Sequence, residues 1–142
     1  MASTLKLNTL TGASTAGSIA VTGEGNSTTT NLQQGLCKAW GNLDGTGTIG
    51  HLDSFNMSSP TDVGTGAFTL SFTNNMANTS YSTIGSAKES TGGTHASDGV
   101  DRILNPSRVV LATSDVKVTA INLSNALRDC DENAAQICGD LA

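Results

Sequence analysis

The feature that most constrains this chain is its small supply of large apolar side chains. Leu, Ile, Val and Phe account for 29 of its 142 residues, whereas Ser, Thr, Asn and Gly account for 64. So low an apolar fraction lies close to the level at which chains stay disordered, but a net charge of −5 is too small to hold the chain open by repulsion. We therefore expect a thin core of β-strands and turns, with further burial against copies of the same chain.

Length and charge exclude several classes of protein. A chain of 142 residues corresponds to one domain. Its seven Lys and Arg residues are scattered singly and form no basic stripe, so we expect no nucleic-acid partner. No run approaches the roughly 20 apolar residues of a membrane span. The first four residues lack the basic and apolar segments of a signal peptide, and we therefore expect synthesis in the cytosol and no membrane partner.

The three cysteines do not form a recognisable metal or disulfide pattern. Cys37, Cys130 and Cys138 are odd in number and lie outside the paired spacings that zinc sites use. We expect reduced, partly buried thiols. A bridge between Cys130 and Cys138 is the alternative, which a cytosolic origin disfavours.

Residues 1–31 predict an extended arm. Two short alternating segments, residues 4–10 and 18–22, read as strands, and Ile19 and Val21 are the large apolar residues of the Thr-, Ser- and Gly-rich tract over 11–30. Such a segment cannot build a core of its own. We therefore expect the arm to need a partner surface.

Residues 32–142 predict an all-β body. Turn signals recur about every 8 to 12 residues, which is typical of an antiparallel β-sandwich, here jelly-roll-like. The clearest strand spans 67–73, where Phe68, Leu70 and Phe72 alternate with small polar residues, and we expect it to pair with 54–59 across the turn at 62–66. Further strands are expected at 47–55, 79–87, 108–112 and 115–122.

Two interpretations of the C-terminus stay open. Apolar residues recur at helical spacing after Ser124, a suitable N-cap, so a short helix is one interpretation. The other is a loop over 129–133 followed by a last strand over 134–141.

The aromatic residues are expected to be mostly internal. With so few large side chains, a stable core requires most of them. If some were exposed, they would offer a stacking platform for a carbohydrate or a base. The predicted core or subunit-contact positions are these five aromatic residues and one leucine: Trp40, Phe55, Phe68, Leu70, Phe72 and Tyr81.

No motif points to catalysis, a metal or a cofactor. Residues 45–50 match the glycine pattern of a dinucleotide-binding loop, but the sequence after them reads as a strand rather than a helix. His51 with Asp53, and His95 with Asp98, lack any surrounding motif. The Asp-Gly turns near 44 and 98 depart from the twelve-residue calcium loop. We expect no enzymatic activity, no cofactor and no metal.

Several runs resemble a domain common in tail-fibre and other virion structural proteins of tailed phages, especially marine ones. They are Gly35-Leu36-Cys37-Lys38-Ala39-Trp40, Asp44-Gly45-Thr46-Gly47-Thr48, Asp53-Ser54-Phe55-Asn56-Met57-Ser58-Ser59, residues 61–66 and residues 68–73. The resemblance implies a non-enzymatic, usually trimeric virion part, assembled in the host cytoplasm and anchored by its N-terminus. Residues 138–141 resemble the terminal strand of that domain, which favours the strand interpretation.

The resemblance also assigns roles. The start of the chain is similar to the attachment segments of such proteins, which implies docking onto other virion proteins (a tail adaptor, fibre or capsid) through Thr4, Leu5, Lys6, Leu7, Asn8, Thr9 and Leu10. A capsid decoration or head-fibre protein is the structural alternative.

Two alternatives belong to other classes of function. A glycan-binding receptor module would contact a host-surface glycan through the loop 62–66 and a distal loop over 88–101 containing Thr91, Thr94, His95 and Asp98. A depolymerase would need paired carboxylates, such as Asp53 with Asp98, and no motif brings them together.

Overall fold

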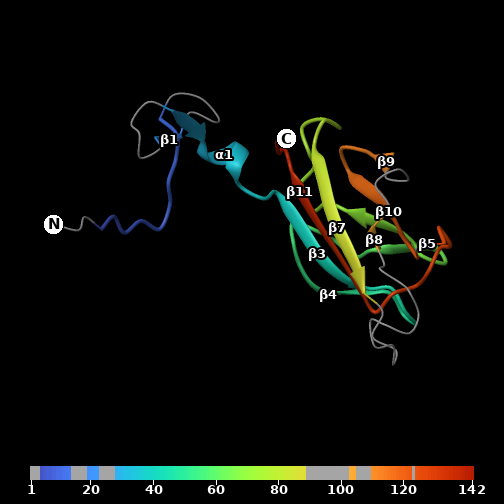
Figure 1. Ribbon diagram of the computed structural model, residues 1–142. Helices are drawn as coiled ribbons and strands as arrows, with labels where there is room; N and C mark the ends of the chain where they lie inside the picture. The colour runs from blue at the N-terminus through green and yellow to red at the C-terminus, as the bar shows by residue number, and fades with distance from the viewer. Residues whose placement is uncertain (1–3, 14–18, 23–27, 89–102, 105–109, 123) are drawn as a thin grey trace. The chain divides into compact units, whose positions relative to one another are not determined.

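The computed structural model describes residues 4–13, 19–22, 28–88, 103–104, 110–122 and 124–142 (Figure 1). The chain divides into two compact units, Met1–Leu36 and Cys37–Ala142, so the division falls a few residues after the expected boundary at residue 31. Apart from one helix of four residues, the described secondary structure is β-strand, which confirms the all-β prediction.

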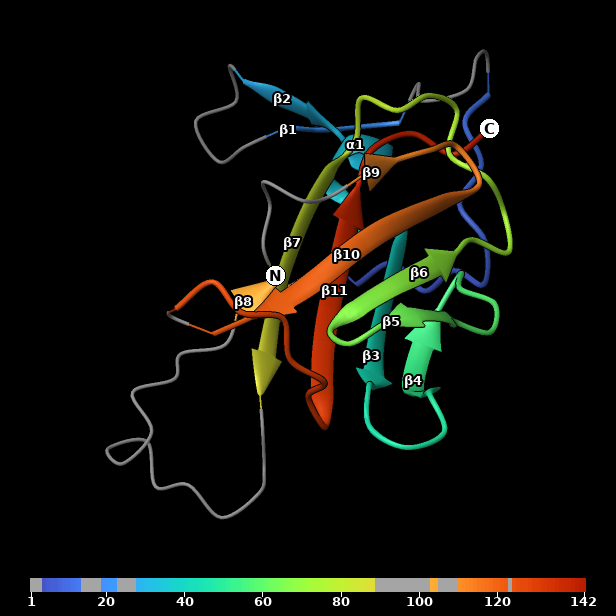
Figure 2. The ribbon, with the colours of Figure 1, turned by 90° about the vertical axis from the view of Figure 1, so that its right-hand side faces the viewer.

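The body is a sandwich of two antiparallel sheets. The first has the order β4 (Gly50–Phe55), β3 (Ala39–Asp44), β11 (Glu132–Cys138) and β7 (Ser82–Lys88). The second has the order β5 (Thr61–Gly64), β6 (Ala67–Ser71), β10 (Asp115–Ile121) and β8 (Ile103–Leu104), with β9 (Val110–Leu111) also paired to β10. Figure 2 shows β6 and β10 lying across β3 and β11.

The core lies between the sheets and follows from strict alternation along the strands. In β6 and β10, Phe68 pairs with Val118 and Leu70 with Val116, and all four side chains are at most 2% exposed. Successive residues of a strand point to opposite faces, so the intervening Thr, Ser and Lys residues point outward. The first sheet contributes three alanines, Ala39, Ala87 and Ala135, together with Leu43 and Ile137.

The C-terminus forms strand β11, so the helix interpretation is wrong for these residues. Ile137 is buried in the core, whereas Gln136 is exposed on the outer face, a period of two. β11 pairs with β3 on one side and with β7 on the other. It fills the gap between two strand edges whose backbone N–H and C=O groups need partners, and this requirement outweighs the helical spacing of its apolar residues.

The expected pairing of residues 54–59 with 67–73 is wrong. β6 pairs instead with β5 across the turn at Gly64 and Gly66, which have φ of +144° and +62°, while β4 pairs with β3 in the other sheet. The two expected segments meet at one end, where Met57 and Phe72 form an antiparallel bridge and the backbone N–H groups of Ser58 and Thr73 donate to the carbonyls of Ser71 and Asn56. The closer segment forms the hairpin because it closes a much shorter loop.

The N-terminal unit contains β1 (Ala20–Thr22), β2 (Thr29–Asn31) and the helix α1 (Leu32–Gly35). β1 pairs with β2, and the Asn31 side chain caps α1 by accepting hydrogen bonds from the backbone N–H groups of Gln33 and Gln34. The arm thus supplies a partner for its own second segment. The strand expected over residues 4–10 is absent, because no described strand pairs with it.

Candidate interaction surface

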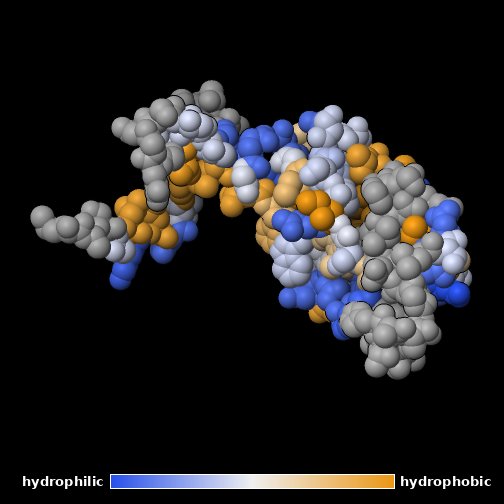
Figure 3. Space-filling model, viewed as in Figure 1, coloured by the Kyte–Doolittle hydropathy of each residue, from blue (hydrophilic) through white to orange (hydrophobic). Residues whose placement is uncertain are grey.

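A row of large side chains crosses the outer face of the first sheet. Phe55 of β4 lies opposite Trp40 of β3, which lies opposite Gln136 of β11, which lies opposite Ile84 of β7. Directly paired residues place their side chains on the same face. We call these four residues the outer row; Figure 3, which views this side of the body, shows hydrophobic patches interleaved with polar ones.

Two residues of the outer row were expected in the core. Trp40 is 37% exposed and Phe55 is 52% exposed, so neither lies in the core of the single chain, and a subunit contact is the part of that prediction that stays open for both. The core prediction is confirmed for the other four positions, which are buried: Phe68, Leu70, Phe72 and Tyr81.

Trp40 points outward because the residues that alternate with it along β3 occupy the inner side of the strand. Ala39 and Leu43 are buried, and Gly41 between them faces the core so closely that an added Cβ would lie 2.7 Å from Sδ of Met57. The inner side of β3 therefore accepts only small residues near its centre. Alternation along the strand then places Trp40 on the outer face.

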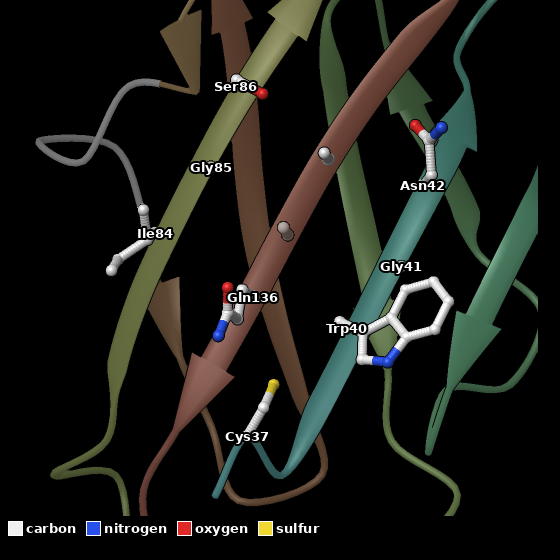
Figure 4. Close-up of a pocket in the computed structure, with 10 residues that line it drawn as sticks. Cys37, Trp40, Gly41, Asn42, Ile84, Gly85, Ser86 and Gln136 are labelled. Carbon is white, nitrogen blue, oxygen red and sulfur yellow. The ribbon is translucent and has the colours of Figure 1, made fainter. Parts of the chain in front are cut away.

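A shallow groove of about 520 Å³ runs beside the outer row. Figure 4 shows Trp40 on β3 and Ile84 on β7 to either side of β11, with the Gln136 side chain between them. Gly85 and Ala134 also line the groove. Small residues at the centre and large ones at the sides leave a hollow that another apolar side chain can enter.

The described residues that line the groove carry no charge. Its polar groups are Cys37, Asn42, Ser86 and Gln136. The Cys37 thiol donates to the backbone carbonyl of Ala39 at 3.1 Å, whereas Oδ1 of Asn42 is buried and has no hydrogen-bond partner in the described part of the chain. The groove is thus suited to a neutral surface.

The charged residues of this sheet include an ion pair towards one end. Lys88 of β7 and Glu132 of β11 are directly paired, and Nζ lies 2.7 Å from Oε1. The hydrogen bond to Glu132 raises the pKa of Lys88, so the lysine stays protonated. Because both side chains are well exposed, solvent screens the pair and it contributes little to stability.

His51 and Asp53 do not form a catalytic dyad. His51 pairs with the inward-facing Leu43 and Asp53 with the outward-facing Asn42, because Leu52 is the extra residue of a β-bulge between them. The His51 ring Nε2 lies 2.9 Å from the carbonyl oxygen of Ser58, and Asp53 accepts a hydrogen bond from its neighbour's backbone. Over the described ranges, no group of three or more His, Cys, Asp or Glu residues could hold a metal ion.

The glycine-rich loop before β4 is a turn. Both the backbone N–H and the hydroxyl of Thr46 donate to Oδ1 of Asp44, at 2.8 and 2.7 Å, and strand β4 follows directly at Gly50. The helix N-terminus that a dinucleotide site would require is not present there. The remaining predicted loop residues, Thr91, Thr94, His95 and Asp98, lie outside the described residues.

The predicted docking segment, residues 4–10, is exposed at every position. Leu5 is 81% exposed, Leu7 54% and Leu10 55%. No described residue of the N-terminal unit is buried. The unit therefore presents its leucines to solvent rather than to a core of its own.

Sequence reasoning did not single out Ile84 and Gln136. The alternation over 79–87 places Ile84 on the side of the strand opposite Tyr81. A large apolar residue on the outward side of a strand indicates a contact surface, and this signal was present in the sequence. Gln136 carried no such signal, since its position became defined only when β11 took its place between β3 and β7.

No protein-family model, curated protein or solved structure matches the chain. In the part of the chain that the structure describes, no helix has the length and apolar character needed to cross a bilayer.

Proposed function

We propose that this chain is a non-enzymatic structural protein of a tailed-phage virion, similar to tail-fibre proteins. It docks onto other virion proteins through its N-terminal arm and trimerises through its β-sandwich body. The observation that carries the proposal is the arm, in which Leu5, Leu7 and Leu10 are all more than half exposed. The resemblance of the chain to phage virion proteins supplies the class of partner.

The energetics of the arm favour docking. Complete burial of a leucine side chain contributes about 1.5–3 kcal/mol, so Leu5, Leu7 and Leu10 together offer several kcal/mol to a partner surface. Ordering the segment offsets part of this gain. A short arm of this kind binds with useful affinity only when its leucines are buried together.

The docking role is tested with a triple variant, Leu5→Ser, Leu7→Ser and Leu10→Ser, in assembled particles. We expect its copy number per virion, measured by quantitative mass spectrometry, to fall at least tenfold while the body stays folded. Val21→Ser is the matched control, because Val21 is 51% exposed in β1 but lies outside the docking segment. Normal incorporation of the triple variant would refute docking through these leucines.

Two other functions remain candidates. A capsid decoration or head-fibre protein would have the same architecture, and electron microscopy of labelled particles separates it by placing the label on the head rather than the tail. A glycan-binding module is favoured by Trp40, whose exposed ring shares the outer face with the amides of Asn42 and Gln136.

A further inference from the structure

We infer that the outer row, with the groove beside it, is the surface on which a second copy of this chain packs. This inference rests on the proposed self-association of the body and assigns it to one face of one sheet. It is carried by three properties of that face: its contrast with the other outer face, its exposed apolar area and the uncharged lining of its groove.

The two outer faces of the sandwich differ in chemistry. On the second sheet, Thr61, Thr69 and Lys117 form the row that corresponds to the outer row, and Val110 of β9 pairs with Lys117 at its end. Neighbouring outward positions there are polar or small, namely Ser71, Asp115, Thr119 and Ala67, and a further exposed apolar residue of this sheet is Val63, 62% exposed at the irregularity of β5. One outer face thus suits water, whereas the other places three large apolar side chains in one line.

The apolar area suits a protein interface. Taking about 200 Å² for a large side chain, the exposed parts of Trp40, Phe55 and Ile84 amount to about 300 Å². A standard interface buries about 800 Å² per partner, of which roughly 55–65% is apolar. The three side chains therefore provide more than half of the apolar area that such an interface needs.

Charge favours this face over the rest of the surface. Each copy carries a net charge of −5, so copies repel one another in general. The groove is lined by uncharged described residues, and the Lys88–Glu132 pair beside it is internally neutral. Asp53, which is directly paired with Asn42, is a charged residue of the same face, but the groove itself lets two copies meet without bringing like charges together.

The occupant that fits is another apolar protein surface rather than a sugar. Ile84 is 67% exposed, more than Trp40 or Phe55. Its side chain has neither a flat ring on which a sugar could stack nor a hydrogen-bonding group. The groove beside it is floored by small residues such as Gly85 and Ala134 and can accept a side chain of the size of isoleucine or tryptophan. Knob and hollow thus occur on the same face, which lets copies of this chain contact one another through it.

The test compares the mass of the full chain with that of two variants by light scattering across a dilution series. We expect a trimer for the natural chain, about three times its 14.4 kDa mass, and a monomer for Ile84→Lys. The matched control is Val110→Lys, since Val110 is 56% exposed on the other outer face, and it should remain trimeric. Phe55→Lys repeats the test at the other end of the row if Ile84→Lys fails to fold.

Trp40 provides a second readout, because it is the only tryptophan. Its emission should shift to the red as the natural chain is diluted and dissociates, and Ile84→Lys should show the red-shifted emission at every concentration. An oligomer that survives Ile84→Lys and Phe55→Lys would overturn this interface. The proposed self-association would then still stand. A monomeric natural chain would overturn both, and a Trp40 emission change on adding host polysaccharide to that monomer would assign the face to a glycan.

Discussion

Asn56 and Asn74 are hydrogen-bonded to each other and thereby connect the ends of two strands that belong to opposite sheets. Oδ1 of Asn56 accepts from the backbone N–H of Asn74 at 2.8 Å and from its side-chain amide at 3.0 Å, while Nδ2 of Asn56 donates to the carbonyls of Asn74 and Lys38. Asn56 follows β4 of the first sheet and has a left-handed φ of +55°. Asn74 lies just beyond β6 of the second sheet. One side chain thus joins the two layers at this end of the sandwich.

Replacing Asn56 should destabilise the body. Asn56→Ala removes the side-chain hydrogen bonds, at about 1 kcal/mol each, and leaves a Cβ-bearing residue in the left-handed region. We expect a loss of about 4–5 kcal/mol in the free energy of unfolding, measured in urea. Asn56→Gly, which removes the same bonds without the backbone strain, should lose about 1 kcal/mol less. Equal stability of the alanine variant and the natural chain would contradict this role.

Gly66 should tolerate no side chain. Its φ is +62°, and an added Cβ would lie 2.5 Å from the backbone nitrogen of Arg128 and 2.7 Å from the carbonyl oxygen of Ala120. Main-chain atoms cannot move away without breaking the hydrogen bond from Ala120 to the Gly66 carbonyl. We expect Gly66→Ala to cost about 4 kcal/mol or more, or to prevent folding.

Gly47→Ala is the control that separates strain from contact. Gly47 has a similar φ of +58°, but an added Cβ would meet nothing within 4 Å. Its alanine variant should lose only the left-handed penalty of about 1–2 kcal/mol. Similar losses at both glycines, measured by thermal unfolding, would mean that the contacts at Gly66 are unimportant.

Tyr81 should make stability fall at alkaline pH. Burial raises its pKa above the ordinary value of 10.0, and its hydroxyl donates to the carbonyl oxygen of Ala112 at 2.9 Å. Because the unfolded chain releases this proton first, the tyrosine's contribution to stability is complete below about pH 10 and is lost as pH rises through the folded-state pKa. Tyr81→Phe should flatten this part of the pH profile, measured by urea midpoints. An unchanged slope would exclude Tyr81 as its source.

Asn133 should not accept replacement by its isosteric acid. Asn133 is 2% exposed, and Nδ2 donates to the carbonyl oxygens of Cys130 at 2.8 Å and Leu43 at 3.3 Å. In Asn133→Asp a buried carboxylate would face two carbonyl oxygens, so we expect a loss of about 3–5 kcal/mol at neutral pH.

The pH dependence of that loss identifies its cause. Burial would raise the pKa of the new carboxyl group, so the variant should regain stability as pH falls and the acid becomes a hydrogen-bond donor. Asn133→Ala carries no charge, and its loss relative to the natural chain should stay constant over the same range. A loss in Asn133→Asp that does not change with pH would point to packing instead of charge.

Strands with one apolar and one polar side could be predicted from the sequence. Phe68, Leu70 and Phe72 alternate with small polar residues, as do Val116 and Val118, and all five are buried. Their period of two defines both the strand and its inner face. The absence of buried residues from the described part of the N-terminal unit was also predictable, because a tract so poor in apolar residues has little to bury.

Strand partners could not be predicted in the same way. The pattern at 67–73 says which face is buried but not whether β5 or the segment at 54–59 lies beside it, since backbone hydrogen bonds carry no sequence identity. The C-terminal residues have apolar positions compatible with either period. Their strand conformation was decided by the free edges of β3 and β7.

The candidate surface depended most on tertiary structure. Composition alone indicated that this chain is short of apolar residues, and that shortage argued for placing Trp40 and Phe55 in the core. The sandwich instead fills the inner side of β3 with Ala39, Gly41 and Leu43, because Met57 and His51 lie so close to Gly41 that no larger side chain fits there. The sequence by itself therefore determined the β class, the strand faces and an N-terminal tract with little to bury. Which aromatic residues reach the surface was decided only by the space between the two packed sheets.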